Sequence, residues 1–271
     1  MGREKVTLTK EKETLLITLY GKALESRQPD SLLQDRFADE AVGKIDYDFA
    51  RLKVDHDLGV GLAIRAKTLD EWVMDFTAKT PNAIVLHIGC GLDTRVFRID
   101  PPAGIEWYDV DYPEVIALRR KLYPSRKNYH LVASSVTDPA WLDQVPRDRP
   151  AMVVAEGITP YLPAEEGPKL FTRLVSHLAS GEIIGDAYSD LGLKLVSLTP
   201  SVRLTGAELH WAINDPRDLE KAAPGLELIE EVSAYKPEHV SRMSWSSQWI
   251  IFLWNFFPPL RRVGRLLRYR F

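Results

Sequence analysis

The sequence Ile84–Arg95, IVLHIGCGLDTR, joins a run of apolar residues directly to a glycine turn. Such a run is typical of a strand that is buried on both faces of a parallel sheet. Asp109 and Asp111 end the next apolar stretch, about 20 residues further on, which is the distance expected in dinucleotide-type folds. A strand, a glycine turn and an acid at the end of the following strand indicate a nucleotide-type site on a doubly wound sheet.

The residues of the turn discriminate between ligands. A pyrophosphate-binding loop favours a third glycine and no negative charge. Here Thr94 takes the place of the third glycine, and Asp93 adds a carboxylate. A carboxylate repels phosphate but suits a ligand that carries a cationic group. S-adenosylmethionine has adenosine, a sulfonium and an amino-acid tail, so we expect it as the cofactor.

Composition narrows the class of protein. With 271 residues, 45% of them hydrophobic, the chain is long enough for one large α/β domain. The net charge of -3 provides no basic field for nucleic acid. The single cysteine, Cys90, excludes an internal disulfide, and the polar first residues do not resemble a signal peptide. The most apolar run, Trp249–Phe257, is too short to span a bilayer, so we expect a cytoplasmic protein without integral membrane contact.

The alternation of apolar and amphipathic segments predicts one domain, residues 1–271, in four parts. Residues 1–80 are mostly helical and are expected to act as a lid. Residues 81–187 alternate strands with helices and form the predicted cofactor-binding core. Residues 188–225 are predicted to supply the acceptor pocket, and residues 226–271 the terminal strands. The expected strands are Ala83–Ile88, Ile105–Val110, Tyr129–Val136, Ala151–Ala155, Glu182–Ala187, Leu226–Tyr235 and Arg265–Phe271, and the expected helices include Pro113–Leu122 and Ala164–Ala179.

Several strand ends carry candidate binding residues. Gly89 and Gly91 permit a sharp turn and a close approach of ligand to backbone. Asp111 is placed to accept hydrogen bonds from a ribose diol, with helix capping before Pro113 as the alternative. Ser135 and Val136 fall where an adenine would lie, although this segment also fits an ordinary strand end. Glu156 directly follows an apolar run, so it needs a partner, either the cofactor or a basic residue of the lid. Gly157 allows backbone contact, and Tyr161 either lines the site or packs in the core.

Three phrases in this order give a specific resemblance: HIGCGLDTR, WYDVDYPEV and VAEGITPYL. Together with TLYGKALESRQPDSLLQD, AIRAKTLDEWV and HWAINDPRDLE they cover most of the chain from Thr14 to Pro224. The sequence resembles the leucine carboxyl methyltransferase family, in particular its bacterial branch of O-methyltransferases of polyketide-type secondary metabolism.

The resemblance implies a class I S-adenosylmethionine-dependent methyltransferase with a seven-stranded, mostly parallel Rossmann-like sheet and a helical N-terminal lid. It implies that Arg65 and Lys22 grip the carboxylate of the cofactor. It assigns Gly89 to the glycine turn, Asp111 to the ribose and Glu156 to the acid after the fourth strand; Cys90, Asp93 and Gly157 adjoin these positions. His87 departs from the usual small or polar residue. For Arg65 the alternative is a helix-surface arginine paired with Asp70 or Glu71.

The predicted reaction is methyl transfer to a hydroxyl or carboxyl oxygen of a small acceptor. Since the sulfonium leaving group is good, the protein chiefly aligns the acceptor. A carboxylate acceptor needs no general base, whereas a phenol or alcohol benefits from one. The candidates for a base are His210, Asp186, Tyr161 and Tyr188, and the sequence does not choose among them. No grouping of histidines with other ligands indicates a metal.

Two other functions are open alternatives. A dinucleotide-linked oxidoreductase is disfavoured by Asp93 and by the missing third glycine, and a non-catalytic methyltransferase-fold regulator or scaffold by the intact site. The sequence gives no oligomeric state.

The second half of the chain is rich in large rings and ends in a basic stretch. Trp211, Trp245, Trp249 and Trp254 fit a wall for a flat acceptor, but core filling is favoured. The arginines from position 261 onward fit the solvated side of a final helix and strand, with contact to a membrane surface as the alternative.

Overall fold

The computed structural model describes residues 3–254 and 256–271. Positions 1, 2 and 255, which fall within the predicted lid and the predicted apolar run, lie outside the described residues. The main sheet has seven strands, in the spatial order β5 (Tyr129–Ala133), β4 (Glu106–Asp111), β3 (Ile84–Ile88), β6 (Ala151–Ala155), β7 (Gly181–Ala187), β9 (Arg265–Arg270) and β8 (Glu227–Ser233). β9 runs antiparallel to both of its neighbours, β7 and β8, whereas the pairs from β5 to β7 are parallel. This confirms the predicted doubly wound, mostly parallel sheet.

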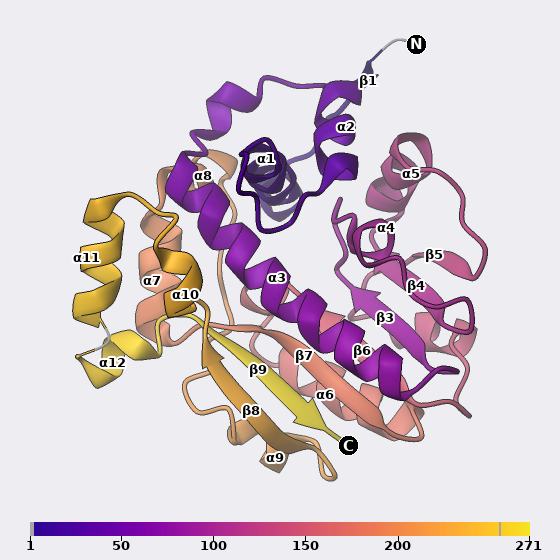
Figure 1. Ribbon diagram of the computed structural model, residues 1–271. Helices are drawn as coiled ribbons and strands as arrows, with labels where there is room; N and C mark the ends of the chain where they lie inside the picture. Colours follow the sequence, from indigo (N-terminus) through magenta and orange to yellow (C-terminus); the bar gives the residue numbers. More distant parts are fainter. Residues whose placement is uncertain (1–2, 255) are drawn as a thin grey trace.

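Alternating side chains bury both faces of the sheet. In β3, Ile84, Leu86 and Ile88 join a core that also contains residues of α6 (Glu166–His177). Val85, between them, belongs to a second core on the other face, formed with α3 (His56–Lys79). Figure 1 shows α3 lying across that face. Burial on both faces explains why the parallel strands read as continuous apolar runs in the sequence.

The N-terminal segment packs as a separate helical layer. α1 (Thr14–Ser26) contacts both α2 (Arg36–Lys44) and α3. Two short strands, β1 (Glu4–Lys5) and β2 (Ile45–Asp46), pair in parallel, which the sequence did not predict. Short 3-10 turns occur at Lys10–Lys12 and Phe49–Leu52.

The remaining helices connect or cover the strands. They are α4 (Arg95–Ile99), α5 (Pro113–Leu122), α7 (Asp190–Leu198), α8 (Pro200–Thr205), α9 (Asp218–Ala222), α10 (Pro237–Val240), α11 (Trp245–Trp254) and α12 (Pro258–Arg261), with 3-10 turns at Pro139–Gln144 and Thr159–Tyr161. The prediction for the terminal region named its strands and one final helix, whereas three helices, α10, α11 and α12, separate β8 from β9. These three helices lie together at one side of the molecule (Figure 1).

Most predicted boundaries agree within two residues, but β5 ends at Ala133 rather than Val136. Ser134 lies beyond the strand, although its N–H still donates to the Asp111 carbonyl of β4 at 2.9 Å. The prediction that the tryptophans fill the core is correct for Trp211, which is 8% exposed. It is wrong for Trp245 and Trp249, which are 75% and 49% exposed. The prediction that the C-terminal arginines are solvated is wrong for Arg265, which is 2% exposed and donates a hydrogen bond to the Ile213 carbonyl.

Candidate active site

The glycine turn after β3 brings backbone to the edge of a cavity. Gly89 and Gly91 adopt left-handed conformations, with φ of +59° and +51°. A Cβ at position 89 would lie 2.4 Å from Cδ1 of Ile158. Both conformation and packing therefore require glycine there. Cys90, between the glycines, also lines the cavity, and burial raises the pKa of its thiol.

Asp111 ends β4 and is buried at the cavity wall. Its Oδ2 accepts a hydrogen bond from the Gly91 N–H at 2.7 Å, and its Oδ1 accepts one from the Tyr112 N–H at 2.7 Å. Burial raises the pKa of Asp111, and the backbone hydrogen bonds offset this only in part. Within residues 3–254 and 256–271 no Lys or Arg pairs with it. Tyr112, not Asp111, is the N-cap of α5, so the capping alternative is wrong.

Glu156, directly after β6, is surrounded by three cations. Its Oε1 lies 2.9 Å from Lys22 Nζ and 3.1 Å from Arg65 Nη2, and its Oε2 accepts from Arg95. Burial raises the pKa of this carboxyl, but the three cations outweigh burial and hold the pKa well below its usual range. The acid is therefore ionised and fixed in position at the mouth of the sheet.

Lys22 reaches Asp93 as well as Glu156. Its Nζ lies 2.7 Å from Asp93 Oδ2, and the side chain is 1% exposed. Asp93 and Glu156 line the cavity, whereas Lys22 is not among the lining residues. The structure thus places Lys22 behind the wall, where it holds two carboxylates that face the cavity.

Arg65, on α3, lies between two acids. Its Nη1 is 2.9 Å from Asp186 Oδ2 and 3.3 Å from the Tyr188 hydroxyl, in addition to the contact with Glu156. Asp186 also accepts a hydrogen bond from the Gly157 N–H at 2.6 Å. Gly157 has φ of +68°, and a Cβ there would approach Arg65 Nη2 to 3.5 Å. These contacts with Glu156, Asp186 and Tyr188 hold the guanidinium in a fixed position at the cavity wall.

The alternative of a surface Arg65 is wrong, because its supposed partners are engaged elsewhere. Asp70 pairs with Arg95 and Arg98, each at 2.7 Å, and Glu71 pairs with Lys236 at 3.1 Å. Sequence reasoning assigned no role to Arg95, although it ends the glycine-turn phrase. One feature of the sequence could have identified this role. An arginine in a turn that also holds several acids without a partner predicts a buried ion pair.

The buried charges around the turn do not balance. Five cations face seven carboxylates: Lys22, Arg65, Arg95, Arg98 and Arg119 against Asp35, Asp70, Asp93, Asp109, Asp111, Glu156 and Asp186. Uncompensated buried charge is unfavourable. A ligand with one net positive charge reduces the excess. S-adenosylmethionine carries a sulfonium, an ammonium and one carboxylate, so these residues fit it.

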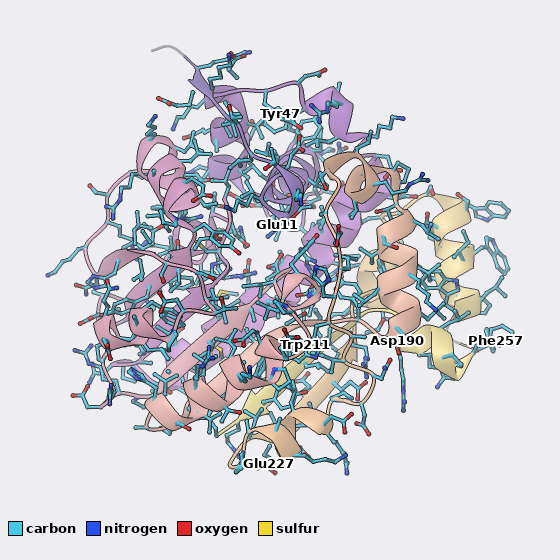
Figure 2. All side chains as sticks on the ribbon, turned by 180° about the vertical axis from the view of Figure 1, so that it is seen from behind. Glu11, Tyr47, Asp190, Trp211, Glu227 and Phe257 are labelled. Atoms are coloured by element: carbon cyan, nitrogen blue, oxygen red, sulfur yellow. The ribbon has the colours of Figure 1, made fainter. Side chains whose placement is uncertain are left out.

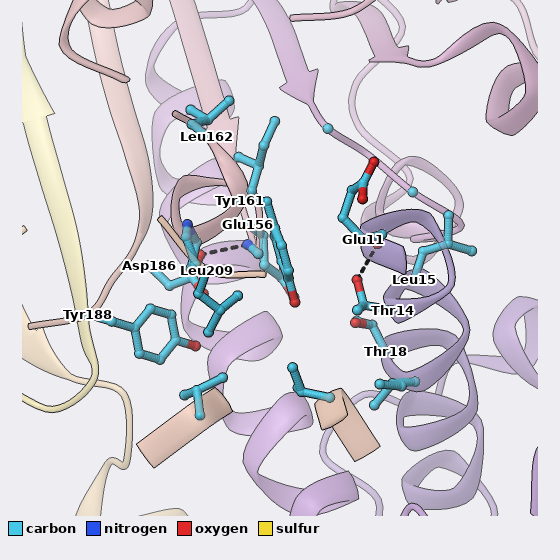
Figure 3. Close-up of a pocket in the computed structure, with 18 of the residues that line it drawn as sticks. Glu11, Thr14, Leu15, Thr18, Glu156, Tyr161, Leu162, Asp186, Tyr188 and Leu209 are labelled. Carbon is cyan, nitrogen blue, oxygen red and sulfur yellow. Dashed lines mark hydrogen bonds between the residues drawn. The ribbon is translucent and has the colours of Figure 1, made fainter. Parts of the chain in front are cut away.

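The cavity continues beyond these charges. Its volume of about 1150 Å³ exceeds the range of roughly 300–1,000 Å³ of ordinary ligand pockets. Aromatic and aliphatic side chains also line it, among them Tyr161, Tyr188, Leu195, Leu209, Tyr235 and Trp254. Figure 3 shows Tyr161, Tyr188 and Leu209 on one side and Glu11, Thr14 and Thr18 on the other. The cavity therefore has room for a cofactor and for a second, largely apolar molecule.

The candidate bases differ in whether their side chains already have hydrogen-bond or ion-pair partners. Asp186 is occupied by Arg65 and by the Gly157 N–H. Burial raises the pKa of Tyr161 and of Tyr188, so both phenols stay protonated at neutral pH. His210 lines the cavity but is exposed, and its backbone N–H donates to the Pro160 carbonyl at 2.7 Å.

Ser135 and Val136 both line the cavity just after β5. The Ser135 hydroxyl lies 2.8 Å from the Thr137 hydroxyl, and Val136 is 7% exposed. The structure thus brings all predicted cofactor residues except Lys22 to one cavity wall.

Comparison with known proteins decides the family. The model of the family described as "Leucine carboxyl methyltransferase" matches residues 16–175. The chain belongs to the leucine carboxyl methyltransferase family. The tetracenomycin polyketide synthesis O-methyltransferase TcmP of Streptomyces glaucescens is 43% identical over 269 residues, which cover 99% of each chain. The S-adenosyl-L-methionine-dependent methyltransferase dpfgK of Gibberella zeae is 32% identical over 293 residues, covering 100% of this chain and 98% of that protein.

Two solved structures share the fold of this methyltransferase. A putative methyltransferase from Thermobifida fusca has a TM-score of 0.60 at 18% identity and covers 90% of this chain and 98% of that one. Magnesium protoporphyrin IX methyltransferase from Synechocystis with bound SAH (S-adenosylhomocysteine) has a TM-score of 0.52 at 15% identity, covering 86% and 92%. At these identities the likeness concerns the fold alone.

These findings confirm the predicted family, fold and activity. The protein is an S-adenosylmethionine-dependent O-methyltransferase, and the oxidoreductase and scaffold alternatives are wrong. Among the described residues, no helix is long and apolar enough to cross a membrane. Within the same residues, no three His, Cys, Asp or Glu side chains gather in a way that could hold a metal ion.

Proposed function

We propose that this enzyme methylates a carboxylate oxygen of a flat, polycyclic acceptor. Two observations support a polyketide-like acceptor: TcmP acts in tetracenomycin polyketide synthesis, and aromatic and aliphatic side chains line part of the cavity. The family name supports a carboxyl group.

The observation that carries the choice of a carboxylate is the state of the candidate bases. Asp186 is saturated by a guanidinium and a backbone N–H, and the raised pKa values of Tyr161 and Tyr188 make their phenolates scarce. A phenol or alcohol acceptor benefits from a base to become a nucleophile, whereas a carboxylate is ionised at neutral pH. Of the four candidate bases only His210, which lines the cavity, is left, and an acceptor that arrives deprotonated does not need it.

The cofactor supplies an electrophilic methyl group when it is bound. In this proposal Asp111 accepts hydrogen bonds from the ribose diol, and the turn of Gly89, Cys90 and Gly91 lies against the ligand. Ser135 and Val136 contact the adenine. Arg65 binds the carboxylate of the amino-acid tail, while Asp93, Glu156 and Gly157 lie near its ammonium. Lys22 acts through others, because it fixes Asp93 and Glu156.

The predicted parts of the domain have corresponding roles. Residues 1–80 act as a lid over the core of residues 81–187, and residues 188–225 form part of the acceptor wall. Lining residues from Lys10 to Arg65 and from Tyr188 to His210 support this division. Residues 226–271 contribute Tyr235 and Trp254 in addition to the terminal strands. We further propose a cytoplasmic location and no nucleic-acid partner, which the lone cysteine and the acidic net charge support.

The test is a pH profile combined with an analysis of the product. Aromatic polycyclic acids and their phenol analogues are incubated with labelled S-adenosylmethionine between about pH 6 and about pH 9, a range over which a carboxylate stays ionised. We expect the acids to give products that mild alkali hydrolyses, with a nearly flat rate. Alkali-stable ethers from the phenols alone, with a rate that rises with pH, would overturn the carboxylate assignment. We expect the His210→Ala variant to methylate the acids at the wild-type rate, because a carboxylate acceptor needs no base.

A further inference from the structure

The most exposed apolar surface of the molecule lies on α11 and the turn that follows it. It consists of Trp245, Trp249, Ile250, Phe252, Leu253, Phe256 and Phe257, which are 48–75% exposed. We call this set the aromatic stripe. The ten residues of α11 include no charged side chain and none that is buried. Figure 2 shows Phe257 at the outer edge of the molecule, beside this helix.

The aromatic stripe is ordered rather than scattered. The ring centroids of Trp245 and Trp249 are 6.2 Å apart, those of Trp249 and Phe252 5.7 Å, and those of Phe252 and Phe256 5.0 Å, all in edge-to-face geometry. Residues spaced by three or four positions share one face of a helix. The rings thus form a continuous ladder along the outer face.

The opposite face of α11 is fastened to the body of the protein. Asp57, at the start of α3, accepts hydrogen bonds from the Ser244 N–H at 2.7 Å and the Ser247 hydroxyl at 2.6 Å. The Gln248 amide donates to the Met243 carbonyl at 2.8 Å. Trp254, at the end of the helix, lines the active-site cavity. These contacts fix the orientation in which the helix presents its rings.

The size of the aromatic stripe matches a protein–protein interface. Five rings that are 49–75% exposed present roughly 600 Å² of apolar surface, taking about 200 Å² for each ring. Ile250 and Leu253 add to this. The largest apolar patch on a typical monomer is about 300–600 Å². A stable interface buries about 800 Å² on each partner, and the stripe alone supplies the larger part of that area.

We propose that the aromatic stripe is the interface with a second copy of this chain, related by a two-fold axis. A two-fold axis pairs one patch with itself, and an uncharged ladder meets its own copy without like-charge repulsion. A lipid surface fits less well, because interfacial helices carry Lys and Arg on their polar face. The corresponding face of α11 carries Ser247 and Gln248, which are hydrogen-bonded to the protein. The exposed Arg261 and Arg262 lie outside that helix, in and after α12.

The test is the mass of the full chain by size-exclusion chromatography with light scattering, from about 1 μM to about 100 μM, since dimers dissociate on dilution. We expect twice the monomer mass for the wild type. Phe252→Glu should raise the dimer dissociation constant by about 100-fold or more, as expected for a central aromatic contact. Met74→Glu, at a residue 40% exposed on α3, is the matched control and should leave the dimer intact.

Binding of S-adenosylhomocysteine by each variant shows that it is folded. If Phe252→Glu fails to fold, Trp245→Ser replaces it, and the wild-type mass still decides. A monomeric wild type at the highest concentration would overturn the proposal. A monomer that cosediments with vesicles containing anionic phosphatidylglycerol, and loses this binding in Phe252→Glu, would assign the aromatic stripe to a lipid surface instead.

Discussion

Lys22 and Glu156 are separated by 134 positions in the sequence and form a buried ion pair of 2.9 Å. One residue belongs to α1 and the other follows β6, so the pair joins the N-terminal helical layer to the sheet. Asp93 completes the contact on the other side of the ammonium. The contact between the helical layer and the sheet therefore depends on buried charges.

Replacing Lys22 by Met should therefore lower the free energy of unfolding by about 3 kcal/mol, because it leaves two carboxylates short of a partner in the interior. Urea denaturation followed by circular dichroism measures the change. Lys79→Met is the control: its ion pair with Asp75 is exposed, so a loss below about 1 kcal/mol is expected. Equal losses in the two variants would contradict a special role for the buried pair.

Asp111→Asn should weaken the binding of S-adenosylhomocysteine by about 1–3 kcal/mol, because an amide accepts fewer hydrogen bonds than a carboxylate. Isothermal titration calorimetry gives the affinity. Glu114→Gln, on the exposed side of α5, provides a control with the same chemical change. The ribose assignment fails if both variants bind like the wild type.

Arg65 and Asp186 should behave as one unit. Arg65→Met is expected to reduce the affinity for S-adenosylhomocysteine by about 1–3 kcal/mol. Asp186→Asn should cost less alone, and nothing further in the Arg65→Met background, because its effect passes through the guanidinium. Calorimetry on the two single variants and the double variant completes a double-mutant cycle. Glu71→Gln is the control away from the cavity. Additive losses would show that Asp186 acts independently.

Acid should destabilise the protein in part through Glu156 and Asp93. The pKa of each carboxyl lies below its ordinary value, despite burial, because the cations around it outweigh desolvation. A carboxyl with a depressed folded-state pKa binds fewer protons folded than unfolded, so its stabilisation is present above the unfolded pKa and is lost on acidification. We expect the urea midpoint to fall as the pH drops from about 5 to about 3. Glu156→Gln should flatten this decline, and an unchanged slope would refute the assignment.

Two glycines should respond oppositely to alanine. Gly89→Ala places a Cβ against Ile158 at a left-handed φ, so we expect a loss of at least about 1–2 kcal/mol and impaired cofactor binding. Gly43→Ala, in α2 with nothing within 4 Å of the added Cβ, should gain about 0.5–1 kcal/mol. Thermal denaturation compares the two directly. A tolerated alanine at position 89 would mean that the turn is free to rearrange.

The sequence predicts the sheet well because period and burial agree there. In β3 and β6 every residue is buried, so the apolar runs mark the strands almost to the residue. Asp111 and Glu156 are predictable for the same reason, since an acid directly after a buried run lies at the carboxyl edge of the sheet.

Other features depend on distant partners and leave no local trace. Arg65 lies on a helix where Asp70 and Glu71 follow five and six positions later, outside the spacing of helix ion pairs. The sequence near Arg65 therefore names no partner, and only the assembled fold presents Glu156 and Asp186. α11 misleads in another way. Tryptophans and phenylalanines usually indicate core, but Trp245 and Trp249 are on the outside, where local sequence carries no information about a partner.

The placement of β9 between β7 and β8 imposes an order on biosynthesis. β8 leaves the ribosome before β9, yet among the strands that the structure describes its one partner is β9. Until residues 265–270 are made, the nascent sheet exposes the unpaired edge of β7, and such edges invite association with other chains. Completion of the sheet is thus a late event, and messenger truncations that remove this one strand would yield an aggregation-prone product instead of a shortened enzyme.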